Sequence, residues 1–410
     1  MNNKKGLQII LLSAFLIETL CITYLLKTEK LASIISIVYF ISGIIIGKII
    51  LFFPEPAKSI FRFENKPYTF LKIFLITTAG ILICYYSISI MNDNLFDYHN
   101  ADMLPVIKKM DQRFLSGQWR HVYDTIPEIW NGSNPIYLPA MWLPFTPAVI
   151  FHIDLRWITV ICLFISFGIS FLLISFKQKI SYIIVAIAAM LLWWLLSEDD
   201  THGLISFSEE GVVIVYYLLL VLAIVFENIF FIGLAACLCM LSRYALIGWL
   251  PAFFIYLVLW KKKKQAFIFS VIGILFFLFL FIIPFGWNAF SRLIQLPSYY
   301  VDFSKRVWQD SPETFLNYIG FAKFFGPEKM HTLHTLLISL SFTVPTLFIL
   351  CCHFLRNKIR ISNIPLAALK ITIVIFYNFI DVPFMYLFFT SSFVSLAMVS
   401  IFMKENKAVF

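Results

Sequence analysis

The sequence is poor in charged residues, because Lys, Arg, Asp and Glu together make up only 13% of its 410 positions. A soluble domain has about 25% charged residues. Hydrophobic residues reach 60% of the chain, and a soluble core of this length cannot hide so much apolar surface. The composition therefore excludes a soluble globular protein and indicates an integral membrane protein.

Cysteine is also scarce, and all seven cysteines fall in apolar runs rather than in polar loops. This placement argues against disulfides, and the pairs Cys237/Cys239 and Cys351/Cys352 lack the spacing of a zinc site. The net charge of +9 does not indicate nucleic-acid binding here, because basic residues beside membrane spans set the topology. We expect a lipid bilayer, and no nucleic acid, among the partners.

Apolar runs of membrane-spanning length recur along the whole chain. Since a span needs about 20 apolar residues, we predict an all-α polytopic fold with about twelve transmembrane helices, and 1–410 forms a single integral-membrane domain. The strong basic clusters in short loops then all fall on one side, which the positive-inside rule makes cytoplasmic. The predicted spans are 7–26, 31–53, 72–91, 157–175, 181–197, 210–226, 229–242, 246–260, 266–286, 336–355, 364–380 and 383–403.

Two long polar loops, 92–156 and 287–335, interrupt the apolar runs, and the same topology makes both extracytoplasmic. In the first loop we expect an amphipathic helix over 103–114, with Asp102 as its N-cap. In the second loop we expect a helix that starts at Pro312. Helices of this kind lie along the membrane surface, which suits an enzyme whose substrates are anchored in the bilayer.

Asp97 is the first candidate for a catalytic group, because it follows the third span closely and lies between aromatic residues. Aromatic neighbours lower the local dielectric and raise the pKa of a carboxylate, which favours a general base. The alternative is a solvated carboxylate at the membrane interface. Asp102 is a weaker candidate because its N-cap position already explains it, and Glu210 either orients an acceptor or is hydrated.

Aromatic side chains of the first loop form a second group of candidates. Trp119, Tyr123, Tyr137 and Trp142 have rings that can stack on a sugar, and the alternative is an aromatic belt at the level of the lipid headgroups. The prolines at 135, 139, 144 and 147 forbid a regular helix through this stretch.

Arg243 is the most informative basic residue, because it interrupts an apolar stretch. A charge near the bilayer centre costs roughly 2.5–3.5 kcal/mol, so Arg243 either meets an anion such as a lipid-linked phosphate or pairs with Glu209 or Glu210. In the second loop Arg306 and His331 are further candidates for phosphate binding. His331 and His334 have the spacing of a metal pair but lack a third ligand.

These motifs give the chain a resemblance to the GT-C superfamily of membrane glycosyltransferases, and most closely to the polyprenol-phosphate-mannose-dependent mannosyltransferases. The likeness covers 93–264. Many of these relatives carry a Gly-Gln-x-Asn element where this chain has Ser208-Glu-Glu-Gly211. The matching motifs are Asp97-Tyr98, the helix that ends at Gly117, Tyr123, Tyr137-Leu138-Pro139 with Pro144, and the segment from Gly233 to Pro251 with Arg243, followed by Lys261–Lys264.

The resemblance implies an inverting transfer of a mannose-like sugar from a polyprenyl-phosphate donor to a lipid- or glycan-linked acceptor at the extracytoplasmic face. Asp97 would be the general base, and no cofactor or metal is implied. The leaving phosphate would meet Arg243, Arg306 or His331. The acceptor or the sugar would contact Asp102, Trp119, Tyr123, Tyr137 and Glu210.

Two other functions remain open. One is an O-antigen polymerase or ligase, which would depend more on loop arginines than on an aspartate next to the membrane. The other is a transporter of lipid-linked glycans, against which the lack of an internal repeat and the low glycine count of 15 both argue. The frequent use of Lys, Ile, Phe and Asn favours a bacterial inner membrane.

Overall fold

The structure is a computed structural model, and it describes residues 2–23, 29–56, 65–99, 101–130, 132–197, 203–261 and 263–404. The predicted end of the first span, at 24–26, lies outside these residues. Nine helices of the described chain are long and apolar enough to cross a membrane, which confirms an all-helical polytopic membrane protein. They are α1 (Asn2–Thr23), α2 (Glu29–Ile50), α3 (Lys66–Asp93), α7 (Arg156–Leu173), α8 (Ile180–Ser197), the continuous run of α12 (Lys263–Phe277), η5 (Leu278–Ile282) and α13 (Ile283–Asp310), then α15 (Met330–Phe354), α16 (Ile364–Asn378) and α17 (Phe388–Phe402).

Three predicted spans correspond to shorter apolar helices. They are α9 (Glu210–Val225), α10 (Ile229–Met240) and α11 (Trp249–Trp260). A total of twelve spans requires that these three helices also cross the membrane.

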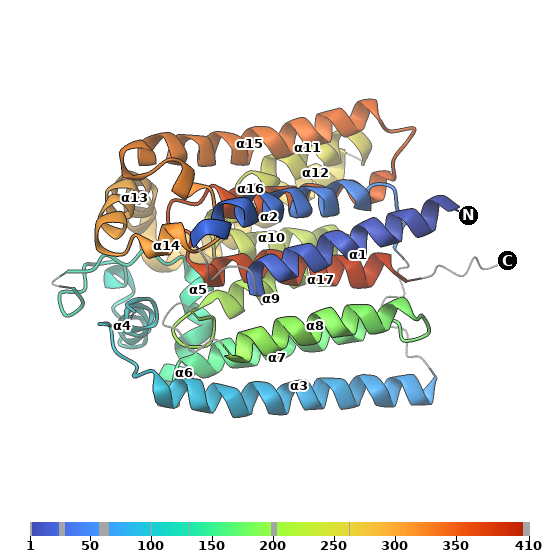
Figure 1. The fold of residues 1–410 in the computed structure, drawn as a ribbon. Helices are drawn as coiled ribbons and strands as arrows, with labels where there is room; N and C mark the ends of the chain where they lie inside the picture. Colours follow the sequence, from blue (N-terminus) through green and yellow to red (C-terminus); the bar gives the residue numbers. More distant parts are fainter. Residues whose placement is uncertain are drawn as a thin grey trace.

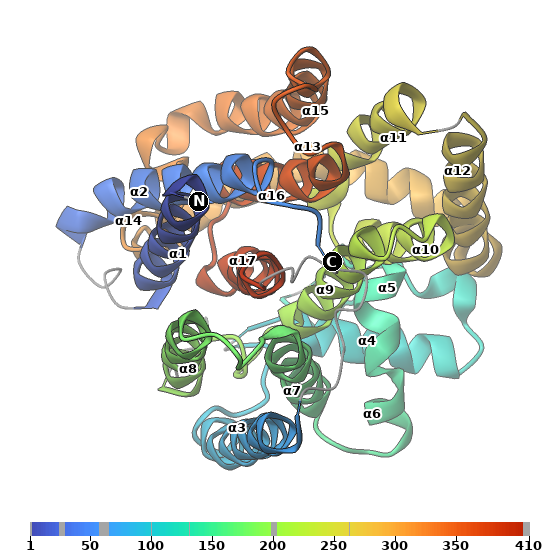
Figure 2. The ribbon, with the colours of Figure 1, turned by 90° about the vertical axis from the view of Figure 1, so that its right-hand side faces the viewer.

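The long helices run side by side, with α1 beginning and α17 ending at the same end of the bundle, which we call the terminal end (Figure 1). The opposite end, which we call the loop end, holds α4 (Met103–Leu115), α5 (Pro139–Trp142), α6 (Thr146–Ile150) and α14 (Glu313–Leu316). Helix α17 lies in the middle of the bundle (Figure 2), and every residue from Met385 to Phe402 is buried. Serine and threonine side chains of α17 are therefore available to bind polar groups inside the bundle.

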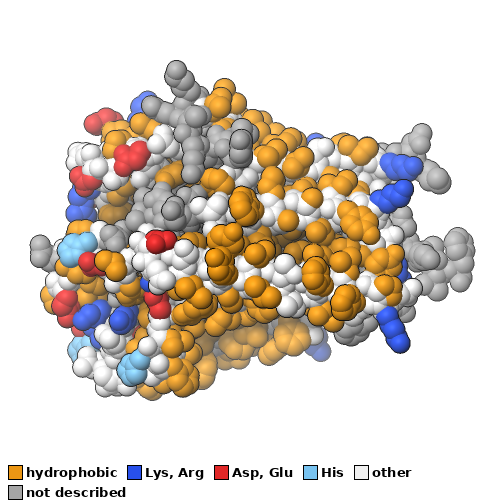
Figure 3. Space-filling view, turned by 60° about the horizontal axis from the view of Figure 1, so that its bottom comes forward, with side chains coloured by type: hydrophobic (Ala, Val, Ile, Leu, Met, Phe, Trp, Pro, Cys, Tyr) orange, Lys and Arg blue, Asp and Glu red, His pale blue; other side chains and the backbone are white. Residues whose placement is uncertain are grey.

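The surface between the two ends is a broad apolar belt. Figure 3 shows hydrophobic side chains across the middle of the molecule, Lys and Arg at the terminal end, and charges of both signs at the loop end. Such a belt is the surface that a lipid bilayer covers. The bundle is thus polarised, with basic residues at one end and mixed polar chemistry at the other.

The first long loop folds largely as predicted. The amphipathic helix is α4, and its buried face includes Leu104, Ile107 and Met110. Asp102 occupies the predicted N-cap position, but its side chain makes no capping hydrogen bond. The prediction that helix capping accounts for this carboxylate is therefore wrong. The proline-rich stretch forms three short helical pieces, each with a proline in its first two positions. Proline is tolerated there because the first N–H groups of a helix have no partner within the helix.

The second long loop differs from the prediction. The chain from 287 onward stays helical as far as Asp310, because α13 continues beyond a local break at Gly286, where φ is 85°. Its inner face packs against α4 and its neighbours through Phe285, Ala289 and Leu293. The helix predicted at Pro312 is only the single turn α14, from Glu313 to Leu316.

Candidate functional site

A buried ionic cluster lies at the loop end, where α9, α16, α17 and the segment after α10 meet. The Nη2 atom of Arg243 lies 2.7 Å from Glu209 Oε1 and 2.6 Å from Glu210 Oε2. The hydroxyls of Tyr377 and Thr390 donate to Glu210 Oε1 at 3.1 and 2.5 Å. We call these five residues the Arg243 cluster. Of the two predictions for Arg243, the ion pair with the glutamates is the one that the structure bears out.

Local sequence explains why both glutamates lie here. Glu209 is the N-cap residue of α9 and Glu210 is its first residue. The N-terminus of a helix favours negative charge. The hydroxyl of Thr159 in α7 donates to the carbonyl of Ser208 at 2.7 Å. A Cβ atom on Gly211 would lie 2.9 Å from the Thr159 carbonyl oxygen, so only glycine lets α9 approach α7 this closely. The segment Ser208-Glu-Glu-Gly211 is therefore built to hold two carboxylates inside the bundle.

The Arg243 cluster holds more acidic than basic groups, because two carboxyl groups face one guanidinium. Glu209 and Glu210 are 1% and 0% exposed, and Glu209 Oε2 has no hydrogen-bond partner among the described residues. A buried acceptor without a donor needs an explanation, such as a bound hydroxyl group or a water molecule. This surplus makes the cluster a poor site for a phosphate and a suitable site for hydroxyl donors.

Asp102 and two tyrosines adjoin this cluster. Burial, helped by the nearby charge of Glu209, raises the pKa of the Asp102 carboxyl. Burial also raises the pKa of the Tyr137 hydroxyl, and the charges of Asp102 and Glu209 add to the effect. Burial raises the pKa of the Tyr300 hydroxyl as well, with added effects from the charges of Asp381, Asp102 and Glu209. The structure therefore brings four predicted site residues together: Asp102, Tyr137, Glu210 and Arg243.

Asp97 lies apart from this group. Its side chain is 47% exposed, and its two carboxylate oxygens lie 3.0 Å from His99 Nδ1. The hydrogen bond with His99 lowers the pKa of Asp97, so the predicted upward shift is wrong. The aromatic residues around Asp97 do not enclose it, and about half of its side chain stays exposed.

The loop that carries Asp97 is anchored by Arg156, which the sequence analysis missed. Arg156 is only 4% exposed and pairs with Asp154 at 2.6 Å. Its guanidinium also donates to the carbonyls of Asn94 at 2.7 Å and Met91 at 3.2 Å. These bonds join the end of α3 to the start of α7 and fix where the first loop leaves the bundle.

The aromatic candidates divide into core and surface residues. Tyr123 is 5% exposed, its hydroxyl accepts a hydrogen bond from Trp142 Nε1 at 3.2 Å, and its ring packs on Phe281 and Phe285. Tyr123 and Trp142 therefore have no ring face free for a sugar, and the stacking prediction is wrong for both. Trp119 is 49% exposed and stays accessible.

The basic candidates of the second loop do not join the Arg243 cluster. Arg306 in α13 and His331 in α15 are both exposed. His334 points elsewhere, because its Nδ1 atom lies 2.6 Å from Asp381 Oδ2. No group of three His, Cys, Asp or Glu side chains within the described ranges could hold a metal ion.

No family model, curated protein or solved structure gives a significant match to this chain. The resemblance to the GT-C enzymes therefore rests on the motifs in the first loop and around Arg243.

A pocket of about 690 Å³ opens at the loop end beside α4. Its wall is mixed, since the cation of Lys108 faces apolar side chains, and Lys108 Nζ lies 5.5 Å from the centre of the Phe96 ring. Lys108 has no carboxylate partner among the ion pairs of the described residues, whereas Asp154, which also lines the pocket, is paired with Arg156. A cation beside an apolar wall suits an amphiphilic anion. The apolar part of the wall includes Leu115, Ile150 and Ile153.

Proposed function

We propose that this chain is a membrane glycosyltransferase of the GT-C type, with α9, α10 and α11 completing twelve spans. It transfers a mannose-like sugar from a polyprenyl phosphate to a lipid- or glycan-linked acceptor. The proposed membrane is a bacterial inner membrane, with the loop end on the extracytoplasmic side. This orientation is supported by the basic residues at the terminal end, which the positive-inside rule assigns to the cytoplasm.

The observation that carries the proposal is the environment of Asp102. This carboxyl group is partly buried at the start of α4, its pKa is raised, and no described side chain donates a hydrogen bond to it. A general base works best when its pKa lies near the working pH. Asp97, the base that the resemblance implies, has a lowered pKa and is already bonded to His99. We therefore assign the base role to Asp102.

In the proposed reaction Asp102 takes the proton of the acceptor hydroxyl as its oxygen bonds to the anomeric carbon. The bond from that carbon to the phosphate oxygen breaks, and its electron pair leaves with the polyprenyl phosphate, so the anomeric configuration inverts. Lys108 supplies positive charge to the leaving phosphate, because Arg243 is already neutralised.

The experiment uses purified protein in vesicles with a radiolabelled polyprenyl-phosphate sugar and membrane extract as the source of acceptor. Asp102→Asn is compared with Asp97→Asn, which removes the same charge from the same loop. We expect transfer to fall at least about 100-fold in Asp102→Asn, as for the loss of a general base, and to stay near wild type in Asp97→Asn.

Four outcomes would contradict the proposal or its assignment of the base. Undiminished transfer by Asp102→Asn would refute the base assignment, and loss confined to Asp97→Asn would return that role to Asp97. Movement of labelled lipid between leaflets without sugar transfer would identify a transporter. Transfer of whole glycan chains rather than single sugars would identify a polymerase or ligase.

A further inference from the structure

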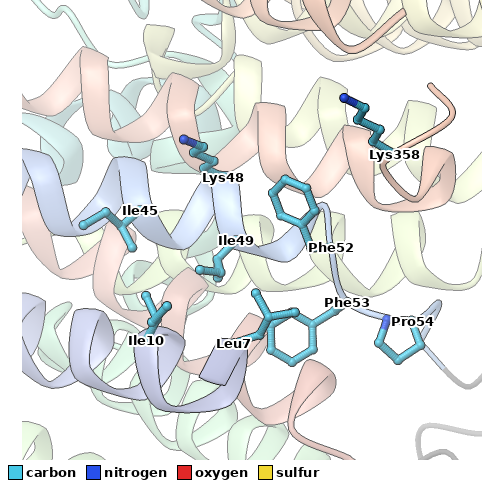
Figure 4. A pocket seen from close by; sticks show the side chains of 9 residues that line it. All are labelled: Leu7, Ile10, Ile45, Lys48, Ile49, Phe52, Phe53, Pro54 and Lys358. Carbon is cyan, nitrogen blue, oxygen red and sulfur yellow. The ribbon is translucent and has the colours of Figure 1, made fainter. Parts of the chain in front are cut away.

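The terminal end of the bundle holds a pocket that the proposed reaction does not use. Its volume is about 730 Å³, and it lies between α1, α2 and the segment after α15 (Figure 4). Most of its lining is apolar. Leu7 and Ile10 contribute from α1, Ile45 and Ile49 contribute from α2, and the charged residues of the lining are Lys48 and Lys358.

Hydrogen bonds join the two chain segments that carry the lysines of this pocket. The backbone N–H of Arg360 donates to the Leu51 carbonyl at 2.8 Å. The side-chain amide of Asn363 donates to the carbonyls of Ile50, the last residue of α2, and of Phe53 just after it, at 2.9 Å each. These three bonds tie the segment that carries Lys358 to the end of the helix that carries Lys48. The pocket is therefore a fixed part of the fold rather than a chance gap between two helices.

The charge of the two lysines is not neutralised by the protein. Both side chains are exposed, and neither pairs with a carboxylate in the described part of the chain, whereas Lys261 at the same end pairs with Glu227 at 3.5 Å. Figure 4 shows both lysine side chains on the same side of α2, above the apolar residues. Two free ammonium groups beside an apolar wall complement an anionic headgroup joined to acyl chains.

We propose that this pocket binds an anionic phospholipid of the leaflet at the terminal end. The lipid phosphate lies between Lys48 and Lys358, and an acyl chain runs along Ile10 and Ile45. The occupant is a lipid rather than free phosphate, because most of the lining is apolar and needs hydrocarbon against it. This site is separate from the proposed transferase chemistry, which lies at the opposite end of the bundle.

The test is native mass spectrometry of the purified protein titrated with dioleoyl phosphatidylglycerol. The double variant Lys48→Gln/Lys358→Gln is compared with Lys177→Gln/Lys179→Gln, which removes the same charge from exposed lysines of the α7–α8 connection. The attraction of one lysine to an anionic membrane surface corresponds to about fivefold in affinity, so the double variant should bind about 30-fold more weakly. The control pair should bind like the wild type, and dioleoyl phosphatidylcholine should bind at least about tenfold more weakly than phosphatidylglycerol.

The proposal fails if the control pair weakens binding as much as the pocket pair, since the effect would then reflect general surface charge. It also fails if phosphatidylcholine binds as tightly as phosphatidylglycerol, or if inorganic phosphate displaces the lipid at equal concentration. Ile10→Gln keeps both lysines and tests the acyl contact, and unchanged affinity in this variant would refute the placement of the chain. Equal unfolding temperatures for all variants would establish that the lysine and isoleucine changes leave the fold intact.

Discussion

Glu18 of α1 and Lys370 of α16 form an ion pair inside the bundle. Both side chains are 0% exposed, and their charged atoms lie 2.6 Å apart. The hydroxyls of Ser391 and Ser395 in α17 donate to Glu18 at 3.0 and 2.7 Å, and Lys370 also donates to the Ser391 hydroxyl at 2.7 Å. Removing one partner should destabilise the bundle strongly, while replacing both should not.

The magnitude follows from desolvation. Lys370→Met leaves Glu18 without a cation in the core, and removing one partner of a buried pair costs about 3–5 kcal/mol. Glu18→Leu leaves the ammonium unpaired and should cost a similar amount. Glu18→Leu/Lys370→Met removes both charges at similar volume, and such replacements are often neutral or stabilising. Ser391 and Ser395 can then donate to backbone carbonyls one turn earlier in α17, so we expect the double variant to lie within about 1 kcal/mol of the wild type.

The assay is a double-mutant cycle on the free energy of unfolding, measured by denaturant titration of the purified protein in detergent micelles. The coupling between the two sites should be at least about 3 kcal/mol. A double variant that loses the sum of the two single losses would show that the charges do not interact. If each single variant kept the wild-type free energy of unfolding, the pair would have to be exposed to water. Either result would refute the reasoning.

Two further predictions concern the loop end. Arg243→Gln leaves two buried carboxylates without a cation and should lower the free energy of unfolding by about 3–5 kcal/mol, whereas Glu209→Gln removes only the surplus charge and should stay near wild type. Equal losses in these two variants, measured by denaturant titration, would contradict the cluster geometry. Burial raises the pKa of Asp111 from 3.8 to about 8, so the folded state holds a proton that the unfolded state releases, and stability should fall by up to about 5 kcal/mol as the pH rises from about 4 to 8. Asp111→Asn should remove this fall, and an unchanged pH dependence of the unfolding temperature in the variant would contradict it.

The positions of the helices could be predicted because lipid selects long apolar runs. The short helices on either side of Arg243 were predicted for the same reason, since Arg243 and Gly248 interrupt the run between them. The length of α13 was not predictable from hydropathy, because hydropathy marks where lipid ends rather than where a helix ends. The chain leaves the apolar belt near Ile294, yet it stays helical to Asp310. In this part of α13, Val301, Val307 and Trp308 pack in an apolar cluster with Phe315 and Leu333.

The choice between Asp97 and Asp102 could not be made from the sequence. The two residues lie five positions apart in one polar loop, and both have aromatic or apolar neighbours. Which carboxylate turns inward depends on contacts between distant segments, namely the Arg156 bonds to the end of α3 and the approach of Asp102 to Glu209. Local composition carries no signal for either contact.

The depth of Arg243 in the bundle, by contrast, is related to helix lengths. The helices α9 and α10 have 16 and 12 residues, or about 24 and 18 Å at 1.5 Å per residue. Two antiparallel neighbours of comparable length return the chain close to the level at which it started, which brings Arg243 to about the depth of Glu209 and Glu210. The charge of Glu209, which belongs to the same cluster, helps burial to raise the pKa of Asp102. The residue that we assign as the base therefore owes part of its basicity to a cluster whose depth is related to the lengths of two short helices.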